Sequence, residues 1–418
     1  MNRRRFLAGS GAALTALGVP SGALGATQPG RKLIVVYAPG GWDITRVFAD
    51  AFGNTNVDME TFATPASAGG IAWVSHPERP SVDVFFQNFH DDAVVLNGVM
   101  VRSIAHEICT MISLTGTTSG LAPDWPAVVA AADRTAYTLP HLVISGPSFP
   151  GDLGVAVART GIAGQLEALV SGEVESWSAV PVVHPDRVAE SLIDRHMARR
   201  AEARAASWRS TVEQELVGAF DDSMNKLTAL KDLRYTMDFT ASPFLEDQAR
   251  VAVDALARGV SRCVTLSYAG LQGQGWDTHA NNDTQQSPLW EELFAGLLEL
   301  MVSLHSTPGT SAPTLADETL VVVMSEMGRT PQLNGLLGKD HWPYTSALLV
   351  GPGLTGDRVV GGFDDVFYGH PVDPASGDVA ETAPLLSAET LGATLLSWAD
   401  IDPGPYVSGV EPLTGILT

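Results

Sequence analysis

The stretch "TLVVVMSEMGRTPQLNGLLGKDHWPYTSALLVGPG" (residues 319–353) contains two apolar runs separated by a polar, glycine-containing segment. The first run, Leu320 to Met324, has the length and β-branched content of a buried strand, and it ends at Ser325-Glu326. An Asp340-His341 pair precedes the second run, Ala347 to Val350. Ordinary turn chemistry explains such polar residues. The alternative is a metal or anion site at the carboxyl ends of a parallel sheet.

Further apolar runs of strand length occur on both sides of this stretch. They cover residues 32–38, 91–99, 139–147 and 263–270, and helical spacing appears at 102–114, 288–305 and 389–400. Buried strands that alternate with helices predict an α/β fold with a doubly wound, mostly parallel sheet and helices on both faces. The charged, helical stretch from about 186 to 262 is expected to form a helical insertion or layer within one domain, 27–418.

The first 26 residues form a unit of their own. Three arginines, Arg3 to Arg5, precede a mildly apolar stretch rich in Ala and Gly, and small residues near Ala26 offer a cleavage point. This order is typical of a twin-arginine signal peptide, which predicts use of the Tat translocase and a periplasmic or secreted protein. The alternative, an uncleaved anchor, is disfavoured because the stretch is too short and too glycine-rich to span a bilayer.

The charge balance is strongly acidic. The 418 residues carry a formal net charge of −22, and removing the three leader arginines leaves 22 basic against 47 acidic residues, 22 − 47 = −25. Nucleic acid and anionic membranes are therefore disfavoured as partners. An anionic substrate remains compatible, because a bound cation inverts the local field. Cys109 and Cys263 are predicted either to pair or to be buried thiols.

Acidic and imidazole side chains follow several predicted strands. Asp43 ends the turn Gly40-Gly41-Trp42-Asp43, where it either caps its own loop or contributes to a site. A second Gly-Trp-Asp triplet ends at Asp277, and His279 lies two residues later. In an extended segment these two side chains project to the same side. A carboxylate beside an imidazole suits Zn, Mn or Fe, whereas the alternative is a surface loop with a capping Asp.

The opening stretch supplies the remaining candidates. Glu326 is a candidate ligand or general base, and Arg329 a candidate for holding an anionic group; alternatively the two form an ion pair. His341 is the best single ligand candidate, with Asp340 as a second ligand or as the group that orients it. Ser103, before the helix at 102–114, is a candidate nucleophile or a helix cap.

Taken in order, the Tat-like leader, "YAPGGWD", "GWDTH", "TLVVVMSEMGRTPQLNG" and "KDHWP" resemble the exported bacterial family known as domain of unknown function 1501 (DUF1501). The resemblance runs from about residue 31 to 402. That family is grouped with the alkaline phosphatase and sulfatase superfamily, which implies a two-metal site at the strand ends. It implies a ligand role for Asp43, Asp277, His279 and His341, with Ser103 near the nucleophile. Ser325-Glu326 stands where the working hydrolases carry Asp-His, which leaves fewer nitrogen ligands.

The sequence therefore predicts an exported protein with a strand-end pocket. Its metal ligands are expected among Asp43, Asp277, His279, Glu326, Asp340 and His341, and its catalytic residues among Ser103, Glu326 and Arg329. A divalent metal such as Zn, Mn or Ca would assist hydrolysis or transfer at a phosphate or sulfate ester, a small anionic substrate. The rival hypothesis is a non-catalytic periplasmic binding or assembly protein with a degenerate metal site.

Overall fold

The computed structural model describes residues 30–161, 166, 187–207, 210–233, 236–239, 242–270 and 273–418, so the leader at 1–26 lies outside the described residues. The strands are β1 (Lys32–Tyr37), β2 (Thr64–Ala68), β3 (Ile71–Ser75), β4 (Ala93–Met100), β5 (His141–Val143), β6 (Val157–Arg159), β7 (Cys263–Ser267), β8 (Thr319–Met324), β9 (Gly328–Arg329), β10 (His341–Trp342), β11 (Tyr344–Val350) and β12 (Arg358–Gly361). The helices are α2 (Pro80–Phe89), α3 (His106–Thr115), α4 (Trp125–Ala132), α6 (Arg187–Ala205), α7 (Thr211–Leu233), α8 (Leu245–Ala257), α9 (Asn282–Ser306) and α10 (Ala388–Trp398).

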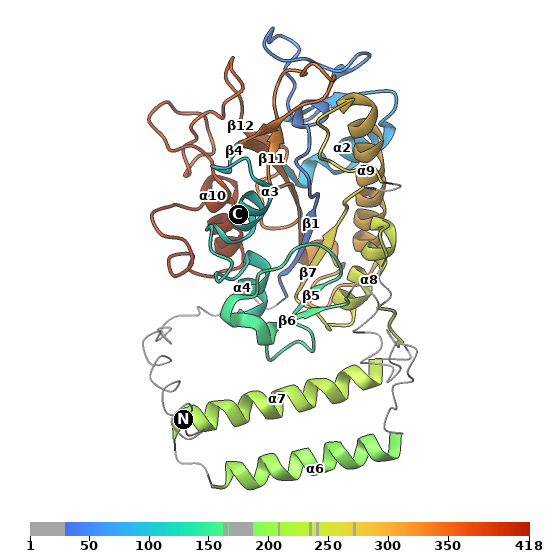
Figure 1. Cartoon of the computed structure of the whole chain (residues 1–418), viewed down its shortest axis with the longest axis vertical. Helices are drawn as coiled ribbons and strands as arrows, with labels where there is room; N and C mark the ends of the chain where they lie inside the picture. The colour runs from blue at the N-terminus through green and yellow to red at the C-terminus, as the bar shows by residue number, and fades with distance from the viewer. Residues whose placement is uncertain are drawn as a thin grey trace, which may run out of the picture.

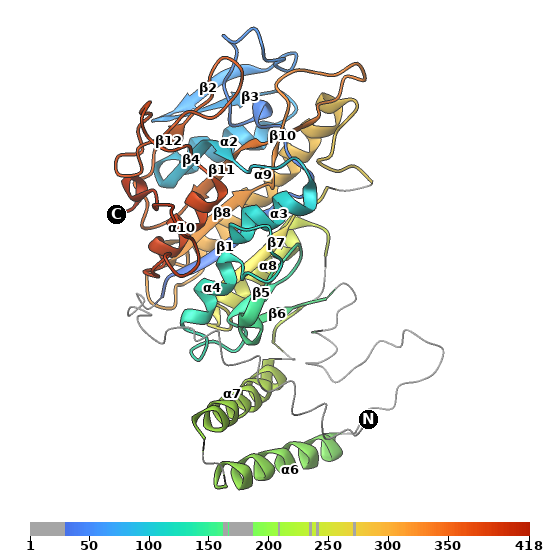
Figure 2. The ribbon, with the colours of Figure 1, turned by 60° about the vertical axis from the view of Figure 1, so that its left-hand side comes forward.

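Eight of these strands form one sheet in the order β12-β4-β11-β8-β1-β7-β5-β6. Every neighbouring pair is parallel except those of β11, which runs antiparallel to both β4 and β8. In β1 the buried side chains alternate between the two faces. Ile34 and Val36 pack into the core that also contains α8 and α9, whereas Leu33 and Val35 pack toward α4 and α10. Figures 1 and 2 show the two helical layers on opposite sides of the sheet.

The predicted α/β architecture is confirmed: the sheet is mostly parallel and helices cover both of its faces. The antiparallel strand β11 is the exception, and it has a consequence for the site. A strand that runs against its neighbours begins at the edge where they end. The segment just before β11, which contains His341, therefore lies at the same edge as the end of β8.

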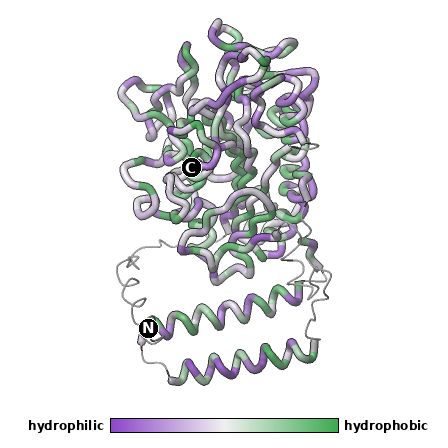
Figure 3. Tube along the Cα trace, in the orientation of Figure 1, coloured by the Kyte–Doolittle hydropathy of each residue, from purple (hydrophilic) through white to green (hydrophobic). Residues whose placement is uncertain are grey.

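The helical stretch predicted at about 186–262 divides into two parts. Helices α6 and α7 pack on each other and lie beyond the end of the sheet (Figure 1), with the side chain of Lys226 donating to the Arg134 carbonyl at 2.6 Å. Helix α8 instead buries Leu245, Ala252 and Leu256 against the sheet layer. Within this stretch, α6 and α7 lie outside the layers of the sheet, whereas α8 belongs to one of them. In Figure 3 the apolar segments gather in the strands of the body, while α6 and α7 alternate between apolar and polar turns.

The two Gly-Trp-Asp turns share one aromatic core. Trp42 and Trp276 are completely buried, with ring centroids 6.4 Å apart in an edge-to-face arrangement. Trp290 of α9 stacks on Trp42 at 4.9 Å. A Cβ atom on Gly40, whose φ is +121°, would lie 3.0 Å from the Asp277 backbone nitrogen. The first turn therefore needs glycine to approach the second so closely, and the tryptophans anchor both turns.

Two further features bear on the sequence-based predictions. Cys109 and Cys263 are both buried and unpaired. Of the two predicted possibilities, a disulfide or two buried thiols, the structure has the thiols. Within the described residues, no helix combines the length and the apolar composition needed to cross a bilayer.

Glu318 anchors the amino end of the sheet, and its contribution to stability should depend on pH. Its carboxylate accepts hydrogen bonds from Lys32, from Thr310 and from Ser311. Burial alone raises the pKa of Glu318, but the bonds from Lys32 and Ser311 outweigh it and lower the pKa to about 2. A depressed folded-state pKa stabilises the protein above the unfolded-state pKa, and this stability is lost as pH falls toward the folded-state pKa.

We therefore expect Glu318→Gln to lower the free energy of unfolding by about 2–3 kcal/mol at pH 7. The difference from wild type should shrink as pH falls from about 5 toward 2. Urea titrations of both proteins across that range measure it, with the exposed neighbour Asp317→Asn as the matched control. A gap that stays constant with pH would contradict the assigned pKa.

Candidate metal centre

Segments that are distant in the sequence bring three histidines and one aspartate together at one edge of the sheet. Asp277 and His279 follow β7, His106 begins α3 after β4, and His341 lies in β10 just before β11. Because parallel strands end at the same edge, and β11 starts there, these loops converge.

The histidine nitrogens converge on the Asp277 carboxylate. The Nε2 atoms of His279 and His341 lie 3.1 and 3.2 Å from Asp277 Oδ1, and 3.0 Å from each other. The Nε2 atom of His106 lies 3.5 Å from Asp277 Oδ2. One ligand atom each from His106, Asp277 and His341 lies within 4.8 Å of the other two. His279 joins this group of three through Asp277 and His341.

The opposite nitrogen of each imidazole has its own partner. His106 Nδ1 lies 2.8 Å from Glu326 Oε1, and His279 Nδ1 lies 2.9 Å from Asp340 Oδ1. His341 Nδ1 donates to the Ile104 carbonyl at 2.7 Å. A hydrogen bond at Nδ1 assigns the proton to that nitrogen and leaves the Nε2 lone pair free toward Asp277. Carboxylates and carbonyls behind the imidazoles are the usual arrangement around protein-bound metals.

These donors fit a divalent cation. Ligand atoms at 2.0–2.1 Å from a tetrahedral metal lie about 3.3 Å from one another, which is close to the separations given above. The Nε2 atom of His106 is moreover buried and has no hydrogen-bond partner, although it points at the cluster. Three imidazoles and one carboxylate suit Zn, Mn or Fe. Calcium prefers oxygen ligands, so this donor set disfavours it.

Arg329 holds Asp277 in place. Its guanidinium is fully buried and donates to the Gly41 carbonyl at 2.7 Å, to the Lys339 carbonyl at 3.1 Å and to Asp277 Oδ1 at 2.5 Å, and it also donates to the Gly40 carbonyl. Partial burial raises the pKa of Asp277, but the hydrogen bond and charge of Arg329 prevail and lower it to about 2. Asp277 is therefore ionised at neutral pH. Arg329 has little capacity left for an anionic ligand.

Glu326 has a comparable role behind His106. This buried carboxylate accepts from Gly40 N at 2.7 Å and from Ser325 Oγ at 3.0 Å, in addition to its bond with His106. That bond raises the pKa of His106 and makes its imidazole more basic. Glu326 and Asp340 thus lie behind the histidines rather than among the converging Nε2 atoms.

Asp43 lies in a separate buried cluster. Its Oδ1 accepts from the backbone and hydroxyl of Thr45 at 3.1 and 2.7 Å, which caps the short helix Ile44–Arg46. Its Oδ2 lies 2.9 Å from Lys339 Nζ and accepts from Asn282 Nδ2 at 2.8 Å. Both oxygens are occupied by the protein's own donors, in line with the capping alternative and not with membership of the histidine cluster.

Ser103 directly precedes Ile104, whose carbonyl accepts a hydrogen bond from His341 Nδ1. Its hydroxyl accepts from Ala105 N at 3.2 Å, ahead of α3, whose N-cap is Ala105 and has no side-chain cap. The structure therefore does not use Ser103 as the helix cap.

His106 is a ligand candidate that the sequence-based prediction missed. The one available signal was its position, because it lies six residues after the end of β4, at the edge of the sheet where Glu326 follows β8.

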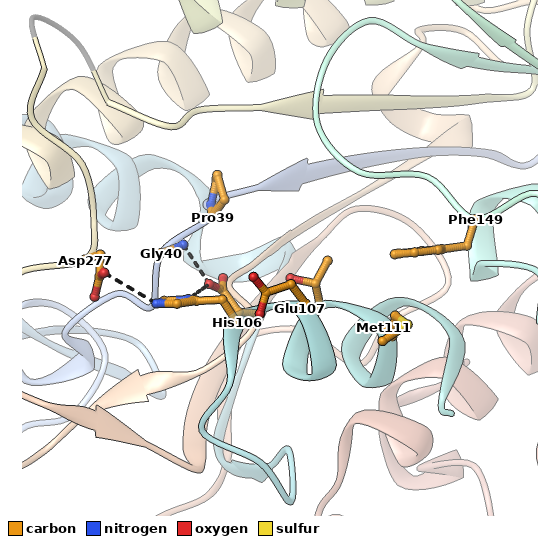
Figure 4. A pocket seen from close by; sticks show the side chains of 9 residues that line it. Pro39, Gly40, His106, Glu107, Met111, Phe149 and Asp277 are labelled. Carbon is orange, nitrogen blue, oxygen red and sulfur yellow. Dashed lines mark hydrogen bonds and ion pairs between the residues drawn. The ribbon is translucent and has the colours of Figure 1, made fainter. Parts of the chain in front are cut away.

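A cavity opens beside the cluster. It has a volume of about 540 Å³ and is lined by Pro39, Gly40, His106, Glu107, Thr110, Met111, Phe149, Asp277 and Glu326. Figure 4 shows Asp277 and His106 at one end and Phe149 and Met111 at the other. Thr110 Oγ1 lies 3.0 Å from the Tyr37 hydroxyl, which donates to Glu326 Oε2 at 3.3 Å. The cluster is therefore accessible from a space large enough for a small organic molecule.

Comparisons with known proteins give a family match and distant structural likenesses. A family model described as "Protein of unknown function (DUF1501)" matches residues 80–383. Among curated proteins, no sequence matches.

Three of the similar solved structures illustrate the likenesses. A putative sulfatase from Bacteroides thetaiotaomicron has a TM-score of 0.42 and 10% identity, with 93% of this chain and 74% of that chain covered. The C-terminal periplasmic domain of EcEptC from Escherichia coli, in complex with Zn, has a TM-score of 0.40 and 9% identity, covering 92% and 88%. The phosphonate monoester hydrolase SpPMH from Silicibacter pomeroyi has a TM-score of 0.37 and 12% identity, covering 92% and 77%.

Proposed function

Since this chain belongs to the protein family of unknown function DUF1501, we propose that it is a metal-dependent hydrolase or transferase that acts on phosphate or sulfate esters. The observation that carries the proposal is the convergence of the Nε2 atoms of His106, His279 and His341 on Asp277, with each Nδ1 held from behind. Such an arrangement has little value to folding, because the aspartate and all three rings are partly exposed to solvent.

The four side chains would hold the metal, and their neighbours would fix their orientation. Glu326 and Asp340 orient the rings of His106 and His279, while Arg329 fixes the Asp277 carboxylate. When bound, a divalent cation supplies Lewis acidity, which offsets the negative charge that develops on the ester during hydrolysis. The Glu326 carboxylate keeps the proton on His106 at Nδ1, so that the Nε2 lone pair remains available.

The overall reaction adds water to the phosphorus or sulfur atom and releases the alcohol. The oxygen–phosphorus or oxygen–sulfur bond to the alcohol breaks, and the alcohol oxygen takes up the proton that water loses. Thr110 lines the cavity, and its hydroxyl is linked through Tyr37 to Glu326. We assign to this chain of hydroxyls the orientation of the reacting groups, because it connects the cavity wall to the buried carboxylate.

The proposal includes export. The leader at 1–26 has the order of a twin-arginine signal, and the periplasm or the exterior is the compartment that follows from it. The acidic net charge of −22 agrees with the absence of nucleic acid among the proposed partners.

A second candidate function is metal binding without catalysis. The observation in its favour is that Arg329, the arginine nearest the cluster, is fully buried and engaged by the protein's own carbonyls and by Asp277. Ester hydrolases commonly orient the anionic group with a cationic side chain, and Arg329 does not supply one here.

Metal analysis combined with an ester screen separates these functions. We expect protein purified after native export to carry about one Zn, Mn or Fe ion per chain. Chelation should abolish turnover of phosphate or sulfate esters, and one of these metals should restore it, whereas Ca should not. Bound metal without turnover of any ester would establish the non-catalytic alternative. A protein that binds no metal would overturn both.

A further inference from the structure

We propose that the cavity selects esters whose alcohol part is apolar, an aryl or alkyl group, over esters carried on polyanionic chains. The inference rests on the proposed function and adds the substrate class of the same site. It depends on the charges and on the apolar surface of the cavity wall.

The wall of the cavity is acidic. Among the described residues that line it, Glu107, Asp277 and Glu326 are acidic, and none is a lysine or an arginine. Arg329 lies close by but is fully buried and directs its donors to backbone carbonyls and to Asp277. A bound cation could offset one anionic group, but nothing else in the wall neutralises a second or a third. A substrate with several sulfates or carboxylates would therefore be repelled.

The end of the cavity away from the metal centre is apolar. Phe149 and Met111 form it, and Pro39 is a further apolar residue of the wall, near Gly40 and His106 (Figure 4). An aromatic ring beside a thioether is a favourable contact for an aryl or alkyl group. The volume of about 540 Å³ accommodates such a group together with a phosphate or sulfate.

Three exposed aliphatic side chains lie near the histidines, outside the wall of the cavity. Ile104, whose carbonyl accepts from His341, is 56% exposed. Leu336 and Leu337, which are 69% and 62% exposed, lie beside His279 because the backbone of Leu337 pairs with Ala280. The selectivity therefore rests on the apolar residues inside the wall, Phe149, Met111 and Pro39, which suit the organic part of an ester better than a sugar chain.

The test compares substrates and ligands on the metal-loaded protein. Phenyl phosphate and n-hexyl phosphate separate the aromatic from the aliphatic form of the proposal, and methyl phosphate and a sulfated disaccharide represent small and polyanionic esters. We expect the apolar esters to have a kcat/KM at least about tenfold higher than the other two, given the value of an aromatic contact and of buried CH₂ groups. Calorimetry that compares the dissociation constants of phenylphosphonate and methylphosphonate tests the same preference without turnover.

Phe149→Ala is the decisive variant. It should raise KM for phenyl phosphate about fivefold to tenfold and weaken the binding of phenylphosphonate by a similar factor. The KM for methyl phosphate, the kcat for phenyl phosphate and the metal content should stay unchanged. Glu107→Lys should raise kcat/KM for the sulfated disaccharide. Phe52→Ala, also a partly exposed phenylalanine but not part of this cavity wall, is the matched control.

The outcomes distinguish this inference from the proposed function. If no ester is turned over but phenylphosphonate still binds better than methylphosphonate through Phe149, the proposed function fails and the selectivity holds. If esters are hydrolysed but the disaccharide is preferred, or Phe149→Ala leaves phenylphosphonate binding unchanged, the selectivity is overturned and the hydrolase stands. Failure of both phosphonates to bind also overturns the selectivity.

Discussion

Asp277→Ala is expected to lose the bound metal and, with it, all metal-dependent turnover. Asp277 is the carboxylate that lies within 3.1 to 3.5 Å of the Nε2 atoms of all three histidines. Removal of a group that merely orients a ligand weakens metal binding 10–100-fold, so loss of the ligand itself should exceed about 100-fold. Metal competition with a chromogenic chelator measures the affinity, and elemental analysis the content.

Two companion variants keep this experiment interpretable. Asp277→Ala leaves the buried Arg329 without its carboxylate, whereas Asp277→Asn retains an acceptor for the guanidinium and so separates loss of a ligand from loss of structure. Glu326→Gln should give the smaller, 10–100-fold loss of affinity, because Glu326 acts through His106. The exposed Asp254→Asn on α8 is the matched control and should bind metal like wild type. Full metal content in a folded Asp277→Asn variant would exclude Asp277 as a ligand.

Asp43→Asn should destabilise the fold and leave the metal affinity unchanged. Asp43 is fully buried between Lys339 and Arg46, at 2.9 and 3.4 Å. Burial raises the pKa of Asp43, but the charges of Arg46 and Lys339 outweigh it and hold the pKa well below its usual value. Neutralising this carboxylate leaves the buried Lys339 without its counterion, whereas Arg46 keeps its ion pairs with Asp283 and Glu60. The loss of the partner of a buried charge costs about 3–5 kcal/mol. Urea unfolding measures the loss, and the chelator competition measures the metal affinity.

A milder variant covers the case in which Asp43→Asn does not fold. Thr45→Val removes the hydroxyl that donates to Asp43 and accepts from Lys339, so it should lower the free energy of unfolding by about 1–3 kcal/mol with full metal content. A folded Asp43→Asn protein with undiminished stability and reduced metal affinity would instead make Asp43 a ligand, as the family resemblance implies.

The strand-end rule explains how much of the site the sequence could predict. Asp277, Glu326 and His341 each lie beside a recognisable apolar run, and ends of parallel strands share an edge. Their convergence therefore follows from the pattern, and the family match over residues 80–383 confirms the resemblance drawn from the same motifs.

The remaining features of the site depend on pairings between distant segments. Lys339 forms an ion pair with Asp43, although the two residues are 296 positions apart in the sequence (339 − 43). No local sequence pattern predicts such a contact. His106 reaches the cluster because β4 lies next to β11, an order that the sequence does not contain. The sequence predicts that Arg329 binds an anion. In the structure its guanidinium is instead buried, because it donates to the backbone carbonyl of the Gly40-Gly41 turn.

The reversal of β11 has a consequence for how this site can change over evolutionary time. The chain leaves the sheet after Met324 and returns at Tyr344 on the adjacent strand, at the same edge. That single excursion contains Glu326, Arg329, Asp340 and His341, and its own small ladder, β9 with β10, gives it internal order. An exchange of these few residues between relatives would change one ligand, His341, and the groups that orient His106, His279 and Asp277, and it would leave the scaffold of the sheet unaltered.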